Sequence, residues 1–240
     1  SIWGSLIGGM VGFSLGGPFG MLLGSLIGGK ISRSKSRMGF ASYAQPQQIF
    51  ALSLIVLSAK LSKADGQISR EELIAVKEKL RIPENELDQV GKIFNKAKEE
   101  ATGYEPYAQQ IAQIYKDNIN VLEEVINILF YIAEADGNVS DEEFKMIHHI
   151  SQIFGLNEIE FNGIVEGRKS SDKLNPYVVL ESQPNDNLVD IRKRYLKLSK
   201  EHHPDLLLSK GVPQEVIEES KKKMRAINLA WDQIQKLKSN

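Results

Sequence analysis

Residues 187–206, NLVDIRKRYLKLSKEHHPDL, decide how the C-terminal part of this chain folds. Four of them recur at i, i+4, i+7 and i+11, the spacing of one helix face: Ile191, Tyr195, Leu198 and His202. Four basic residues lie off that face: Arg192, Lys193, Lys197 and Lys200. The segment therefore predicts a helix that buries one side and presents positive charge on the other.

The tripeptide His203-Pro204-Asp205 follows this helix directly. Pro204 has no backbone N–H and disfavours a helical conformation at His203, so the helix must end at or before the tripeptide. We expect the tripeptide in an exposed loop at the end of the cationic face. This arrangement indicates a docking surface, and no catalytic residue is predicted.

Sequence on both sides of the tripeptide makes this segment resemble a J domain, the module by which DnaJ-family co-chaperones act on a DnaK-type ATPase. Tyr177 and Leu180 match the Tyr-x-x-Leu of the family's first helix, and Asn187 can cap the second helix, with Asp190 at the third position. Downstream, an apolar stripe on a long helix matches the family pattern and should pack against Tyr195 and Leu198: Met224, Ile227, Ala230 and Trp231.

The resemblance implies a set of DnaK-binding residues: His203, Pro204, Asp205, Arg192, Lys193, Tyr195, Lys197 and Lys200. Three positions depart from the family pattern. Glu181 replaces a glycine, Leu206 replaces a lysine, and Leu196 stands where a basic residue often follows the tyrosine. These departures reduce the positive face, so they bear on affinity and on the choice of partner.

The N-terminal segment, residues 1–29, indicates a transmembrane helix. It has no charged side chain and is long enough to cross a bilayer core of about 30 Å. The basic segment that follows, residues 30–44, places the rest of the chain in the cytoplasm by the positive-inside rule and sets cations beside anionic lipid headgroups. An alternative is a short helical hairpin that turns at Gly16-Gly17-Pro18, although each arm would be too short to span.

Glycine recurs every four residues along the predicted transmembrane helix. Such a row leaves a groove in which a second helix can approach the backbone closely, and a homodimer is the simplest such assembly. The glycines are Gly4, Gly8, Gly12, Gly16, Gly20, Gly24 and Gly28.

An internal repeat organises the middle of the chain, because Ala-Asp-Gly at 64–66 returns at 135–137. Ser69 with Glu72, and Ser140 with Glu143, have capping-box spacing, so each copy predicts a turn followed by a new helix. The region resembles the TerB type of all-helical domain. The only candidate metal ligands are Asp65, Glu72, Asp136 and Glu143, and turns and caps already explain them, so no metal or other cofactor is predicted.

Composition excludes several other classes of protein. The chain has no cysteine, so it has neither disulfides nor a cysteine zinc site, and its formal net charge is −1. Basic residues are not interleaved with aromatic ones in a recognised nucleic-acid-binding motif, so we expect no nucleic-acid partner.

Together the three regions resemble the DjlA type of bacterial membrane-anchored co-chaperone. The predicted all-α order is a transmembrane helix (1–29), a basic segment (30–44), a TerB-like bundle (45–166), a linker (167–174) and a J domain with an antiparallel helical hairpin (175–240). The resemblance implies a non-enzymatic inner-membrane protein that recruits a cytoplasmic DnaK-type chaperone and stimulates its ATPase. The alternative is a membrane-bound sensory or scaffolding protein that acts through the TerB-like domain, with a degenerate J domain.

Overall fold

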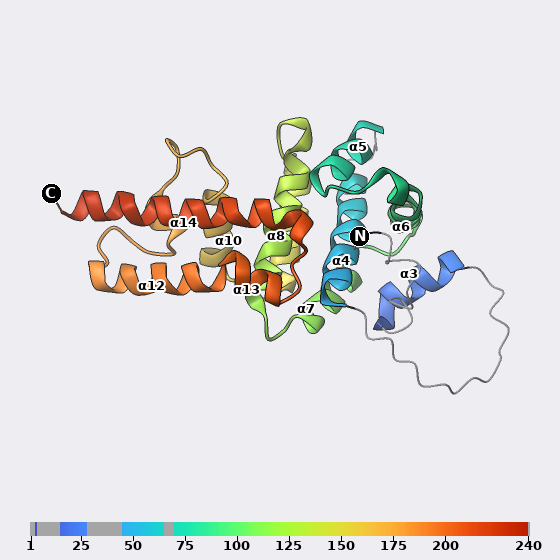
Figure 1. Cartoon of the computed structure of the whole chain (residues 1–240), viewed down its shortest axis with the longest axis horizontal. Helices are drawn as coiled ribbons and strands as arrows, with labels where there is room; N and C mark the ends of the chain where they lie inside the picture. The colour runs from blue at the N-terminus through green and yellow to red at the C-terminus, as the bar shows by residue number, and fades with distance from the viewer. Residues whose placement is uncertain (1–2, 4–14, 28–44, 65–69, 240) are drawn as a thin grey trace.

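The computed structural model describes residues 3, 15–27, 45–64 and 70–239. Every regular element in that part of the chain is an α-helix or a short 3-10 helix, so the predicted all-α fold is confirmed. In Figure 1, α4 to α10 form one group of helices, and α12 and α14 extend from it side by side.

The larger group of helices, called the bundle below, is built around two buried helices. The first is α4, Pro46–Ala64, which is buried from residue 50 to residue 62. The second is α8, Ile119–Ala133, whose apolar side chains are buried, among them Val121, Val125 and Leu129. The remaining helices of the bundle are α5 (Arg70–Lys79), α6 (Leu87–Glu99), α7 (Glu105–Ile114), α9 (Asp141–Ile153) and α10 (Glu158–Glu166), with 3-10 turns η1 (Glu84–Glu86) and η2 (Glu134–Asp136).

The second copy of the repeat forms the predicted turn and cap. Gly137 adopts a φ of +113° after η2, a conformation that favours glycine. Ser140 then caps α9: its hydroxyl accepts from the Glu143 N–H at 3.1 Å, and the Glu143 carboxylate accepts from the Ser140 N–H at 2.8 Å. The predicted capping box is therefore confirmed at this copy. Ser69 of the first copy lies outside the described residues.

The C-terminal region forms a second, smaller core. Its helices are α11 (Pro176–Val179), α12 (Leu188–Glu201), α13 (Pro204–Ser209), the 3-10 turn η3 (Gln214–Val216) and α14 (Ile217–Lys238). Figure 1 shows α12 and α14 running antiparallel, and we call this pair the hairpin. Leu180 and Ile191 are fully buried between these helices, with Ile227, Ala230 and Ile234 of α14.

The segment after the tripeptide belongs to the bundle core and not to the hairpin core. Its apolar side chains pack with those of the bundle helices. They come from α13, the connection after it, η3 and the start of α14: Leu207, Val212, Val216 and Ile217. Gly211 (φ +98°) has no room for a β-carbon, which would lie 2.4 Å from Pro46 at the start of α4. The segment that joins α12 to α14 is therefore anchored in the apolar core of the bundle.

The N-terminal helix α3, Gly17–Ile27, is 11 residues long and packs against α6 and α7. It begins where Gly16 and Gly17 adopt φ values of +62° and +56°, at the position where the alternative helical hairpin would turn. Phe19 lies edge-on to Tyr107, with ring centroids 5.0 Å apart. Within the described ranges, no helix is long and apolar enough to cross a membrane.

Most of the predicted transmembrane segment lies outside the described residues, so the choice between one helix and a hairpin stays a prediction. The same holds for the glycine row. Gly16, Gly20 and Gly24 are described, whereas Gly4, Gly8, Gly12 and Gly28 are not. The basic residues of segment 30–44 are also outside the described part.

Candidate functional site

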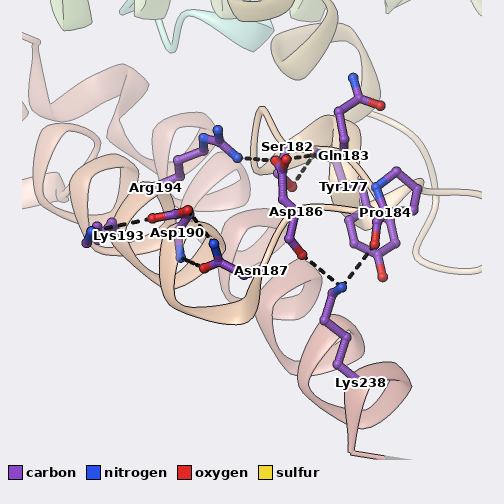
Figure 2. A network of polar contacts seen from close by, with 10 residues as sticks. All are labelled: Tyr177, Ser182, Gln183, Pro184, Asp186, Asn187, Asp190, Lys193, Arg194 and Lys238. Atoms are coloured by element: carbon purple, nitrogen blue, oxygen red, sulfur yellow. Dashed lines mark hydrogen bonds and ion pairs between the residues drawn. The ribbon is translucent and has the colours of Figure 1, made fainter.

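The candidate site begins with α12, whose start is fixed by its own side chains. Asn187 accepts from the Asp190 N–H at 2.8 Å, which is the predicted N-cap. Figure 2 shows the network around it: Lys238, at the end of α14, donates to the backbone carbonyls of Pro184 and Asp186, both at 2.9 Å. Arg194 pairs with the Asp186 carboxylate. This network closes the end of the hairpin that is distant from the tripeptide.

The inner face of α12 packs on α14 largely as the periodicity predicts. Ile191 and Leu198 are buried there. Tyr195 is half-buried: its ring stacks on Trp231 with centroids 5.1 Å apart and planes 7° apart, and its hydroxyl donates to Asn228 at 3.1 Å. Tyr195 is therefore occupied within the hairpin, and only part of it is open to a partner.

The outer face of α12 carries the predicted cations. All four are exposed: Arg192, Lys193, Lys197 and Lys200. Lys193 and Lys197 make ion pairs of 3.4 and 4.0 Å with Asp190 and Glu201 of the same helix. Exposed pairs of this kind are worth about 0–1 kcal/mol, so a partner's carboxylates can readily displace them. Leu196, half-exposed on this side of the helix, is an apolar spot among the cations.

The tripeptide differs from the predicted loop, because it begins a new helix. α12 ends at Glu201, as expected before a proline, but Pro204 is the first residue of α13. A proline is tolerated there because the first N–H of a helix has no partner within the helix. His203 caps α13: its Nδ1 accepts from the Asp205 N–H at 3.2 Å, so the neutral ring carries its proton on Nε2. The side chains of His203 and Asp205 are 56% and 88% exposed.

The neighbouring residue His202 has the opposite environment, which the sequence did not indicate. It was expected on the apolar face of α12, but its fully buried imidazole points at two glutamates of α8. Its Nε2 lies 2.6 Å from Glu123 and its Nδ1 lies 3.5 Å from Glu124. Neither ring nitrogen has hydrogen-bond geometry to these carboxylates, so the contacts are ion pairs. Lys223 of α14 reaches Glu123 at 3.4 Å, and Ser220 donates to Glu124 at 2.7 Å.

We call His202, Glu123, Glu124, Ser220 and Lys223 the buried charge cluster. Burial and Lys223 act to lower the pKa of His202, but the two carboxylates outweigh them and raise that pKa above 6.5. Burial likewise acts to raise the pKa of both glutamates, yet the cations hold the two values below 4.5. The raised pKa of His202 favours the charged form of its ring, so the cluster sets two basic side chains, His202 and Lys223, against two carboxylates.

A further polar contact holds the end of α12 itself. Asn120 of α8 donates to the backbone carbonyl of Glu201 at 2.8 Å, and Lys210 lies 3.4 Å from the Asn120 side-chain oxygen. A carbonyl in the last turn of a helix lacks a partner within the helix. Bundle and hairpin are thus linked by polar contacts on both sides of the tripeptide.

The segment predicted as a linker is also fixed to the bundle. Arg168 donates to both carboxylate oxygens of Glu134, at 2.8 and 2.6 Å, and to the side-chain oxygen of Asn127, at 2.6 Å. Glu166 accepts from the Asn175 N–H at 2.6 Å. These contacts hold the connection between α10 and α11 against α8, so it does not act as a free tether.

The candidate metal ligands of the repeat are only partly described. Glu143 serves the capping box, while Asp65 and the side chains of Glu72 and Asp136 lie outside the described part. Among the residues that the structure describes, no group of three or more histidine, aspartate or glutamate side chains could hold a metal ion.

Comparison with known proteins agrees with this architecture. Residues 51–166 match the family described as tellurite resistance protein TerB, and residues 1–38 match the co-chaperone DjlA transmembrane domain. The co-chaperone protein DjlA of Photobacterium profundum is 24% identical over 274 residues, which cover 99% of each chain. DjlA of Escherichia coli K12 is 24% identical over 98% of each chain, and DjlA of Vibrio parahaemolyticus is 26% identical over 86% of this chain and 87% of its own. No solved structure matches. The predicted resemblance is confirmed along nearly the whole length.

Proposed function

Because the chain resembles the DjlA co-chaperones from end to end, we propose that it is a membrane-anchored co-chaperone without catalytic activity of its own. It recruits a cytoplasmic DnaK-type chaperone at the inner membrane and stimulates that chaperone's ATPase. The observation that carries the proposal is the exposed His203-Pro204-Asp205 at the end of an exposed cationic helix face.

The two parts of this surface have different roles in the proposal. The cations of α12 attract an acidic surface of the partner and orient it, because exposed charges act mainly on the rate of encounter. His203 and Asp205 then contact the partner and trigger hydrolysis. Their positions are set by α13, whose apolar side is held in the bundle core. The partner therefore meets a tripeptide that is already ordered, which lowers the entropy cost of binding.

Membrane anchoring rests on the match of residues 1–38 to a transmembrane domain. A single pass, with the rest of the chain in the cytoplasm, follows from the basic residues after the apolar segment. We further propose that the glycine row supports a homodimer. A β-carbon built at Gly24 of α3 would meet no atom of the described residues within 4 Å, so another helix has room there.

The test is single-turnover ATP hydrolysis by the same organism's DnaK-type chaperone, with the full chain in nanodiscs. The full chain is needed because Leu207, Val212, Val216 and Ile217 pack in the bundle core. We expect stimulation by the wild type and a loss of about tenfold or more in His203→Gln, because this residue would be central to the contact. The matched control is His149→Gln, which alters another exposed histidine in α9. Stimulation that survives in His203→Gln would refute the proposal.

A second variant distinguishes the binding of the partner chaperone from the stimulation of its ATPase. Arg192→Gln with Lys200→Gln removes two exposed cations that form no ion pair within the described residues. The concentration for half-maximal stimulation should rise and depend less on salt, while maximal stimulation stays near that of the wild type. If neither this variant nor the wild type stimulated the ATPase, the C-terminal region would be a degenerate J domain, and the sensory or scaffolding function would remain.

A further inference from the structure

A cavity of about 470 Å³ lies where the hairpin meets the bundle, apart from the tripeptide surface. Its walls come from α5, α8, the connection after α10, and α14. Figure 1 shows α14 passing across α8 and α10 in this region. The volume is within the range of small-molecule sites, roughly 300–1,000 Å³. Part of the wall is apolar, from Ile164, Leu174 and Leu229.

The cavity lining is strongly cationic. Two carboxylates line it, Glu134 and Glu219, against six cations: Lys79, Arg168, Lys169, Lys222, Lys223 and Arg225. Four of the cations are paired with glutamates of the protein, in the pairs Arg168–Glu134, Lys169–Glu166, Lys222–Glu219 and Lys223–Glu123. Within the described residues, Lys79 and Arg225 make no ion pair. The lining therefore has an excess of positive charge that an anion would offset.

Two buried polar atoms in the lining also lack a partner among the described residues. One is the donor Nδ2 of Asn127, a residue that is 2% exposed; the other is the acceptor Oε2 of Glu219, a residue that is 7% exposed. The orientation of the Asn127 amide is fixed, because its oxygen accepts from Arg168 at 2.6 Å. A buried polar group without a partner costs about 1–3 kcal/mol. A ligand that both accepts and donates hydrogen bonds would recover that cost.

Lys79 is placed to take part in such binding. Its ammonium lies 3.7 Å from the centroid of the Tyr131 ring, which also lines the cavity. Burial lowers the pKa of Lys79, with Glu219 opposing that effect. An anion bound beside the ammonium would favour its charged form.

We propose that this cavity binds a small phosphorylated molecule that also carries hydroxyl or amino donors, such as a nucleoside monophosphate. The phosphate oxygens accept from Arg225, Lys79 and the Asn127 amide, while a donor of the ligand meets Glu219. A guanidinium suits this task because its geometry matches phosphate. The bound ligand touches α8 and α14 together, so it stabilises the hairpin in its position on the bundle. The proposal is independent of the chaperone function above.

Titration calorimetry of the full chain in a nonionic detergent tests this site, with AMP and inorganic phosphate as probes. We expect AMP to bind more tightly than phosphate, and the melting temperature to rise by about 3 °C at saturating AMP. Lys79→Gln with Arg225→Gln should weaken AMP binding about tenfold or more, because each loses a charge-assisted contact. Neither residue makes an ion pair within the described residues, so the fold should be kept. Lys236→Gln with Lys193→Gln, two exposed lysines elsewhere on the hairpin, is the charge-matched control.

Three results would overturn the proposal. The first is no heat and no thermal shift with either probe. The second is equal binding by the double variant and its control, which would place the anion elsewhere. The third is binding of sulfate as tight as that of AMP at the same ionic strength, which would indicate a general response to anions.

Discussion

His202 and His203 are adjacent in the chain and differ in almost every physical respect. The imidazole of His202 is fully buried between two carboxylates of α8, whereas that of His203 is 56% exposed and caps a short helix. The difference arises because α12 ends at Glu201, so that His202 closes α12 while His203 opens α13, which begins at Pro204. One histidine can therefore face a partner while its neighbour fixes the helix end to the bundle.

The comparison also separates two uses of charge. The cations on the outer face of α12 are in water, where each ion pair contributes little to stability. The buried charge cluster has lost its hydration, and a buried ion pair is often no more stabilising than an apolar contact of the same size. We infer that the cluster contributes specificity, because the observed placement of the hairpin on α8 brings both glutamates to the imidazole.

The largest expected effect is that of His202→Gln on stability. The substitution leaves Glu123 and Glu124 buried with Lys223 as the one remaining cation of the cluster. Removal of one partner from a buried ion pair costs about 3–5 kcal/mol, so we expect a fall of that size in the free energy of unfolding. Urea denaturation of the full chain measures it. His203→Gln, which loses only the exposed cap of α13, should change stability by no more than about 1 kcal/mol.

A double variant sharpens this result. Glu124→Gln added to His202→Gln removes one anion together with one cation, so Lys223 and Glu123 again balance. The double variant should therefore be about 1–2 kcal/mol more stable than the sum of the two single effects would predict, and this difference is the coupling energy between His202 and Glu124. If the loss of stability in the double variant equalled the sum of the losses in the two single variants, the imidazole and Glu124 would not interact. The two histidines would then differ in burial alone.

The next effect is a pH dependence of stability that arises from the buried charge cluster. The pKa of His202 is raised above 6.5 in the folded chain, so its stabilisation is complete below pH 6.5 and is lost as pH rises through the raised value. The pKa values of Glu123 and Glu124 are lowered, so their stabilisation is present above pH 4.5 and is lost as pH falls further. The cluster is therefore strongest between pH 4.5 and 6.5.

Above pH 6.5 the wild type should lose up to about 1.4 kcal/mol per pH unit until His202 is neutral. Urea midpoints at a series of alkaline pH values measure this slope. His202→Gln should flatten it and His203→Gln should not. A slope that is unchanged in His202→Gln would assign the titration to other groups.

The smallest expected effect concerns Glu181, where this chain departs from the glycine of J domains. Its φ is +52°, in the left-handed region, and burial, with Glu123 nearby, raises the pKa of its carboxyl. Glu181→Ala removes the charge and keeps the strained backbone, whereas Glu181→Gly relieves both. We expect the glycine variant to be about 0.5–1 kcal/mol more stable than the alanine variant.

Arg81 provides a matched control for this difference, because its φ is also +52° and it is exposed in the bundle. Arg81→Gly and Arg81→Ala should differ by a similar amount in thermal unfolding. Equal stabilities for Gly and Ala at position 181, beside a difference at position 81, would mean that the backbone at Glu181 is not strained.

Local features of the candidate site could be predicted from the sequence. The spacing of Ile191 and Leu198 marked the buried face of α12, Asn187 marked its first turn, and Pro204 marked its end. The cap of α9 by Ser140 could likewise be predicted from the sequence. Each depends on residues a few positions apart, whose geometry is set by the backbone of a single helix.

The polar side of α8 could not be predicted in this way. The sequence VLEEVINILF at 121–130 suggests that Glu123, Glu124 and Asn127 face water, yet all three are buried. Their covering is the hairpin, which follows later in the chain. The two adjacent glutamates in an otherwise apolar run were the only sign in the sequence that another part of the chain covers this side of α8. They do not indicate which part that is.

The sequence by itself therefore determined the helices, their caps, the break at Pro204 and the cationic face that resembles a J domain, because periodicity and capping act over one or two turns. Only the tertiary structure decided that His202 and not His203 holds the hairpin, that Leu207 and Val212 join the bundle core, and that a cationic cavity lies between α8 and α14. The physical reason is the separation in sequence between the residues that interact. The partners Ser220 and Glu124 are 96 residues apart, and nothing in the local backbone couples them until the helices pack.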